Sequence, residues 1–171
     1  MGNSQLWRLL TATQREGWAA LGAQFIRYDS LGQARDMTGF QAFCSVNNNN
    51  LAAGNTVVSD APLMALPAPI ATVTPTITTA SFGVAYTATP MPAGQRIFVS
   101  ASPMRSAGVS YESDFRLIAV SAAAAASPLN ALAAYQARFG TPVVGSRIFV
   151  SVQAYALGFL STPLITSQVV A

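Results

Sequence analysis

The stretch Gly94-Gln95-Arg96-Ile97-Phe98-Val99-Ser100 recurs later in the chain as Gly145-Ser146-Arg147-Ile148-Phe149-Val150-Ser151. In both copies the side chains alternate in character with a period of two, which is typical of β-strands. We therefore predict that the Ile and Val residues of each copy face a core and that the Arg, Phe and Ser residues share the outer face. One isolated repeat does not indicate a solenoid. We expect the two copies to be neighbouring strands of one sheet.

The same alternation continues on both sides of the repeat and predicts seven strands. They cover residues 70–77, 80–88, 95–102, 108–112, 114–121, 146–155 and 163–170. Seven short strands separated by turn residues are typical of an immunoglobulin or fibronectin type III sandwich. One helix interrupts them, with Ser127 as its N-cap, Pro128 at its first position and Gly140 as its stop signal.

Residues before this sheet region have a helical pattern. Thr13 and Glu16 match a capping box, and Trp18, Leu21 and Phe25 then fall on one face. A short helix is expected before it, near residues 5–10, and a turn or small hairpin after it, at residues 27–33. A further helix is predicted to be capped by Thr38, to end at Asn47–Asn50 before Gly54, and to point four side chains inward: Phe40, Phe43, Cys44 and Leu51.

These patterns predict a mainly β protein with a short helical segment in front of the sandwich. The helical segment covers residues 1–57 and is expected to act as a docking arm. A proline-rich linker follows at 58–69. The sandwich covers residues 70–171.

The chain carries very little charge. Asp, Glu, Lys and Arg make up 9% of its 171 residues, against roughly 25% in average soluble proteins. A neutral surface is easily desolvated against another subunit, which favours a protein that works inside an assembly. All nine cations are arginine, and they are spread along the chain, so no basic stripe indicates a nucleic-acid partner. Prolines and strand-like spacing break the long uncharged stretches, so we expect no membrane span, and the N-terminus does not have the pattern of a secretory signal.

The residues that most catalytic sites need are missing. Histidine is absent, which excludes Ser-His-Asp triads and histidine metal sites. The single cysteine, Cys44, is predicted to be a buried structural thiol. No glycine-rich phosphate loop is present. We therefore predict that the chain is not an enzyme and has no catalytic, metal or cofactor-binding residues.

Glu112 and Asp114 are the only acids close together in the sequence. A calcium site would need several more oxygen ligands from elsewhere. We favour a turn cap, or an ion pair with Arg116 or Arg105.

Two groups of residues are candidates for a protein interface. Phe98 and Phe149, with Arg96 and Arg147, would form a docking patch on the outer face of the sheet if that face is exposed. The alternative is that the helical segment or the 127–139 helix covers the two rings. Trp7, with Arg8, lies near the N-terminus and is the second candidate, because tryptophan is enriched at binding hot spots. Trp18, at core spacing, is expected to be internal.

The C-terminal part resembles a fibronectin type III domain. Arg147-Ile148-Phe149-Val150-Ser151-Val152-Gln153-Ala154-Tyr155, then Leu157-Gly158 and Ser161-Thr162-Pro163, look like its sixth strand, loop and seventh strand. The likeness covers roughly residues 68–171. The usual core tryptophan of the second strand is absent, and Tyr86 takes its place.

The whole arrangement is similar to uncharacterised small proteins of bacteria and their phages. The similarity includes the stretches Leu10-Thr11-Ala12-Thr13-Gln14-Arg15-Glu16-Gly17-Trp18 and Thr38-Gly39-Phe40-Gln41-Ala42-Phe43. It implies a virion component of a tailed bacteriophage, such as a capsid decoration or head-tail protein, with a protein lattice or further copies of itself as partners. An extracellular or cell-surface subunit that forms filaments is the alternative. A carbohydrate-binding module, which would need exposed aromatic side chains on one face, is a third class.

Overall fold

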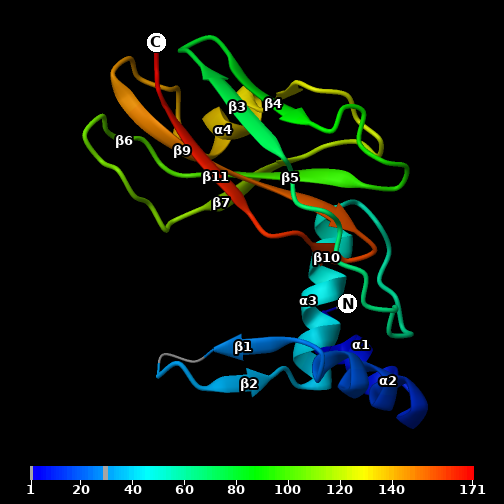
Figure 1. Cartoon of the computed structure of the whole chain (residues 1–171). Coiled ribbons are helices and arrows are strands. Elements are labelled where there is room, and N and C mark those ends of the chain that lie inside the picture. Colours follow the sequence, from blue (N-terminus) through cyan, green and yellow to red (C-terminus); the bar gives the residue numbers. More distant parts are fainter. Residues whose placement is uncertain (1, 29–30) are drawn as a thin grey trace. The chain divides into compact units, whose positions relative to one another are not determined.

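The computed structural model describes residues 2–28 and 31–171, and the chain divides into two compact units. The first unit comprises Met1–Leu66 together with Leu157–Phe159, and the second comprises Pro67–Ala156 and Leu160–Ala171. Helices and antiparallel sheets are both present, so the fold is mixed, with sheet in both units (Figure 1).

Three helices form the first unit: α1 (Asn3–Leu9), α2 (Ala12–Gly22) and α3 (Gly39–Ala52). Between α2 and α3 lies the antiparallel hairpin of β1 (Ile26–Tyr28) and β2 (Ala34–Asp36). This confirms the expected hairpin, although its tip at residues 29–30 lies outside the described residues.

The start of α2 differs from the prediction. Its N-cap is Thr11, whose hydroxyl accepts from the Gln14 amide at 3.2 Å while the Gln14 side chain accepts from the Thr11 amide at 2.9 Å. The Thr13–Glu16 capping box is therefore wrong, because a glutamine serves as well as a glutamate at the third position and the earlier threonine starts the helix. At α3 the predicted cap at Thr38 is confirmed, with Gln41 as its partner.

The run Asn47–Asn50 lies inside α3 and does not end it, which corrects the predicted stop. The side-chain amides bond to other segments of the same unit. Asn47 both donates to the Val58 carbonyl at 3.1 Å and accepts from the Val58 amide at 2.8 Å, Asn48 accepts from Asn3 at 2.8 Å, and Asn49 donates to the Gly158 carbonyl at 2.8 Å. These tertiary bonds replace the local side-chain-to-backbone bonds through which asparagine usually interrupts helices.

The core of the first unit forms around Trp18 and Phe43. Both are fully buried, with ring centroids 5.2 Å apart, and Leu21, Val46 and Phe159 pack in the same cluster. The Trp18 indole N–H donates to the Ser59 carbonyl at 2.7 Å. The predicted inward face of α3 is partly wrong. Phe40 is 38% and Leu51 52% exposed, because the buried stripe runs instead through Ala42, Phe43, Val46, Asn47 and Asn50.

The second unit contains two larger antiparallel sheets. One has the order β3 (Thr72–Ile77), β4 (Phe82–Thr87) and β8 (Leu129–Asn130). The other is built on the long strand β9 (Ser146–Ala156), which pairs with β5 (Arg96–Ala101), β6 (Arg105–Ser106), β10 (Phe159–Leu160) and β11 (Leu164–Val169), while β7 (Arg116–Val120) pairs with β5.

Both larger sheets contribute to one hydrophobic core, an arrangement compatible with a sandwich. Ile77, Phe82 and Val84 of the first sheet share it with Ile97 and Ile148 of the second. The helix α4 (Leu132–Phe139) adds Tyr135 to the same core. The inward face predicted for the repeated strands is therefore confirmed.

Two of the predicted elements are wrong. Residues 108–112 form no strand, and the short strand β6 lies just before them. The predicted helix after Ser127 starts later, at Leu132, because residues 129–130 pair with β4 as strand β8. Its predicted end at Gly140 is confirmed, with φ at 86°.

The two copies of the repeat are neighbouring antiparallel strands, as predicted. Their register pairs Ser100 with Ser151 and Phe98 with Gln153. Phe149 lies opposite Ser102, since the Ser102 amide donates to the Phe149 carbonyl at 2.9 Å. The two phenylalanines therefore lie on opposite sides of the serine pair and are not cross-strand partners.

Three buried serines end strands of this sheet in the same way: Ser102 after β5, Ser121 after β7 and Ser161 after β10. Each serine amide donates to the carbonyl of one residue on the neighbouring strand. The serine hydroxyl accepts from the backbone N–H of that same residue at 2.9–3.0 Å. Each hydroxyl also donates to the carbonyl of the next residue. The hydroxyl thus takes the place of the serine's own carbonyl, so the chain can leave the sheet without leaving a buried N–H unpaired.

We expect Ser102→Ala to lower the free energy of unfolding by about 2 kcal/mol, because the buried Phe149 N–H loses its acceptor. Urea unfolding followed by circular dichroism measures this. Ser100→Ala on the same strand is the control and is expected to cost about 0.5 kcal/mol or less, since Ser100 is only half-buried and its hydroxyl has no hydrogen bond among the described residues. Equal losses in the two variants would contradict the role given to the Ser102 hydroxyl.

Candidate interaction site

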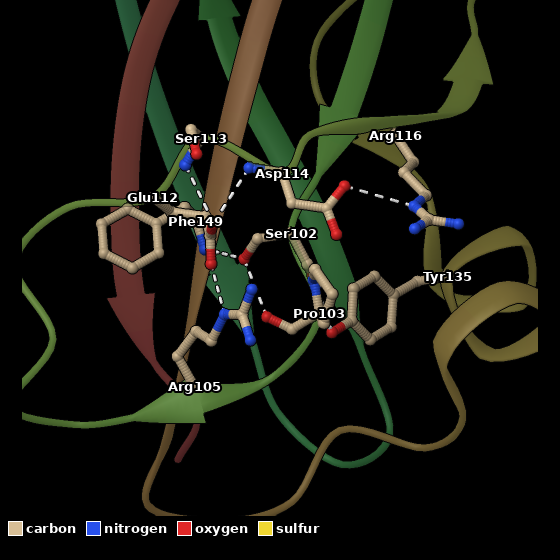
Figure 2. Close-up of polar contacts among 9 residues, drawn as sticks. All are labelled: Ser102, Pro103, Arg105, Glu112, Ser113, Asp114, Arg116, Tyr135 and Phe149. Atoms are coloured by element: carbon tan, nitrogen blue, oxygen red, sulfur yellow. Dashed lines mark hydrogen bonds and ion pairs between the residues drawn. The ribbon is translucent and has the colours of Figure 1, made fainter.

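A compact polar cluster holds the loop between β6 and β7 (Figure 2). The Arg105 Nε donates to Glu112 Oε2 in an ion pair. Glu112 Oε1 accepts from the backbone amides of Ser113 and Asp114 at 2.8 and 2.9 Å. Arg116 and Asp114 form a second, exposed ion pair at 3.3 Å. The predicted roles of Glu112 and Asp114 as turn cap and ion-pair partners are confirmed.

The carboxyl of Glu112 is strongly stabilised in its charged form. Its hydrogen bond with Arg105, followed by its bond with the Asp114 amide, lowers its pKa from 4.5 to about 2. The same contact raises the pKa of Arg105. The Glu112 side chain is only 9% exposed.

The pH dependence of stability follows from that shift. Because the folded-state pKa of Glu112 lies below the unfolded value, its contribution is complete above about pH 5 and is lost as the pH falls towards about 2. We expect Glu112→Gln to lower the thermal midpoint at pH 7 and to flatten its decline between those values. Glu16→Gln on α2, which removes the same charge in the other unit, should keep the wild-type slope. An unchanged slope in Glu112→Gln would contradict the assignment.

Tyr135 and Ser102 lie beside this cluster (Figure 2). The fully buried Tyr135 hydroxyl donates to the Ser102 carbonyl at 3.2 Å. Burial raises the pKa of Tyr135 to about 12, so its hydroxyl stays protonated and acts as a hydrogen-bond donor at neutral pH. This contact fixes the point where the chain leaves β5 for β6.

Arg147 lies directly opposite Arg105 in the β6–β9 ladder, and Ser146 lies opposite Ser106. The Nε of Arg147 is buried and has no hydrogen-bond partner in the part of the chain that the structure describes. Arg147 was a predicted interface residue, whereas Arg105 was considered only as a partner for the acids. The prediction missed their juxtaposition because β6 is too short to show an alternating pattern.

The outer-face aromatic patch is not exposed. Phe98 and Phe149 are each 5% exposed, and Phe98 stacks on Tyr155 with ring centroids 5.2 Å apart. The α4 helix does not cover these rings, since its side chains pack in the core with Ile97 and Val99 of the opposite face. Phe98 and Phe149 therefore form no exposed docking patch, and the alternative that their face is covered is confirmed, although α4 is not what covers it. An alternation with a period of two shows which side chains share a face of the sheet. It does not show whether that face is covered.

Arg96 has a structural contact on the same sheet. Its Nη1 donates to the Ser121 carbonyl at 3.2 Å, where β7 ends. Arg96 is half-buried. It therefore caps a strand end and does not lie beside Arg147.

The N-terminal candidates lie in the first unit. Trp7 is half-buried between Phe40 and Phe43, at centroid distances of 5.6 and 5.5 Å, and Arg15 lies 6.0 Å from its ring. Arg8 is exposed, and its carbonyl accepts from the Arg15 side chain at 3.0 Å. Trp18 is internal, as predicted.

The remaining chemical candidates are Cys44 and the acidic side chains. Cys44 is half-buried, less buried than expected, and desolvation raises its pKa. Within residues 2–28 and 31–171, no group of three or more Cys, Asp or Glu side chains is placed to hold a metal ion. Over the same residues, no helix has the length and apolar character needed to cross a membrane.

No family model, curated protein or solved structure matches this chain.

Proposed function

We propose that this chain is a non-enzymatic structural protein of a tailed bacteriophage, a capsid decoration or head-tail component that docks onto a protein lattice. The second unit would then be an immunoglobulin or fibronectin III-like sandwich, and the virion its location. Six of the seven predicted strands coincide with strands of the two larger sheets, which supports this type of sandwich.

The observation that carries the proposal is a surface poor in charge and rich in apolar side chains. Charged residues make up 9% of the chain. Large apolar side chains that are more than half exposed occur in both units, and they include Leu9, Leu63, Tyr111, Val143 and Val144. Apolar side chains exposed on the surface of a chain with so few charged residues favour burial against another protein.

Mass spectrometry of purified phage particles tests the proposal. We expect the chain in particles that withstand high-salt washing, at a copy number that is a simple multiple of a lattice symmetry. An antibody against the purified protein should label the same particles. If the chain is absent from the particles while it is abundant in the lysate, the virion role is wrong.

The edge strand β11 favours a second candidate, a subunit that self-associates into extracellular or surface filaments. Residues 164–169 contain no charged side chain and no proline, and Ile165 and Val169 are 50% and 38% exposed. Natural edge strands usually carry charges or proline that block pairing with another chain. Light scattering at rising protein concentration separates the candidates, because a filament subunit grows in mass whereas a decoration protein stays at its starting mass.

A further inference from the structure

Two arginines face one another at one end of the β9 sheet. Arg105 of β6 and Arg147 of β9 are directly paired in an antiparallel ladder, so their side chains leave the sheet on the same face with Cβ atoms about 5 Å apart. Like charges in this position repel and destabilise the pair of strands. Such a pair needs a negative group for compensation.

The chain supplies only part of that compensation. Glu112 binds Arg105 through Oε2, while its Oε1 is occupied by two backbone amides. Asp114, the other acid of the loop, pairs with Arg116. In the described residues the Arg147 side chain takes part in no ion pair, and its Nε is buried without an acceptor.

The arginine pair is also accessible. The Arg105 side chain is 39% exposed, and Arg147 is half-buried. On the other edge of β9, Val169 of β11 lies opposite Arg147 and is 38% exposed. The site thus combines two guanidinium groups with a neighbouring apolar side chain. Guanidinium groups match planar carboxylates through two parallel hydrogen bonds.

We propose that Arg105 and Arg147 form an oxyanion-binding site whose ligand is a carboxylate of an acidic side chain on a partner protein. The ligand carboxylate accepts from the Nη groups of Arg147, since Nε is buried, and it balances the second positive charge. An apolar neighbour of the acidic residue packs on Val169. The identity of the carboxylate as a protein side chain rests on the proposed assembly role. The anion site itself does not.

Nuclear magnetic resonance titration of the full-length protein tests the site. The probes are sodium acetate, sodium phosphate and the peptide acetyl-Val-Glu-Val-amide, each compared with sodium chloride at equal ionic strength. We expect acetate and the peptide to cause saturable shifts of the backbone amides of Arg105, Arg147 and Val169, with the peptide binding more tightly than acetate.

Three variants define the result. R147Q should weaken binding of the peptide at least about tenfold, because one charge and the guanidinium donors of Arg147 are lost. R147K keeps the positive charge but lacks the planar guanidinium group, so it should weaken peptide binding about threefold. R8Q removes an exposed arginine of the first unit and should bind like the wild type. If R147Q does not fold, R105Q tests the same site from the neighbouring strand.

Absence of saturable shifts at these amides, equal binding by wild type and R147Q, or an equal loss in R8Q overturns the site. Binding of phosphate without binding of acetate or the peptide overturns the carboxylate assignment. If the protein binds the peptide through Arg147 but is missing from phage particles, the anion site stands and the virion role is wrong. The two failures are therefore distinguishable.

Discussion

Replacing Phe43 by alanine is expected to lower the free energy of unfolding of the first unit by about 4 kcal/mol. Phe43 is fully buried in α3, and its ring contacts both Trp7 and Trp18 at centroid distances of 5.5 and 5.2 Å. Removing the ring takes away its burial and leaves a cavity between two indoles that helices hold in place. Such a cavity cannot close without moving α1 or α2 on α3.

Tryptophan fluorescence in a urea titration measures this loss selectively. The chain has two tryptophans, and both belong to the first unit. Phe40→Ala is the matched control, since Phe40 lies on the same helix and also contacts Trp7 but is 38% exposed. We expect it to cost about 1 kcal/mol. Similar costs for the two variants would show that Phe43 is not central to this core.

Gly158→Ala is expected to destabilise the same unit by about 3 kcal/mol, although Gly158 lies far from the helices in sequence. Its φ is +89°, and an added Cβ would lie 2.4 Å from Val46 Cγ1 and 3.1 Å from the Val46 carbonyl oxygen. The carbonyl of Gly158 accepts from Asn49 at 2.8 Å. The neighbouring Phe159 packs in the helical core and stacks on Phe25.

Gly54→Ala separates backbone strain from this close approach. Gly54 has a similar φ of +76°, but a Cβ there meets no atom within 4 Å. It should therefore cost only the left-handed strain of about 1 kcal/mol. Tryptophan fluorescence reads both variants. If Gly158→Ala costs no more than Gly54→Ala, the contact with Val46 contributes nothing to the stability of the unit.

Packing against Gly158 and Phe159 is a feature that local sequence patterns could not predict. Leu157-Gly158 has the pattern of an ordinary strand-to-strand turn. A glycine is needed there not only for the turn but also because α3 packs closely against it. That helix lies more than a hundred residues earlier in the chain. Asn47, Asn48 and Asn49 of α3 were misjudged for the same reason, because their bonds to Val58, Asn3 and Gly158 are tertiary.

The sequence by itself determined the positions of most strands, the cap at Thr38, the end of α4 at Gly140 and the pairing of the repeated strands, because local periodicity and terminal residues specify these features. It also determined that catalytic chemistry based on histidine is absent. Only the tertiary structure decided that Phe98 and Phe149 are covered, that Ser102, Ser121 and Ser161 close the sheet, and that Arg105 faces Arg147. These features depend on register and on segments distant in sequence, and a period of two specifies a face but neither its neighbours nor its exposure.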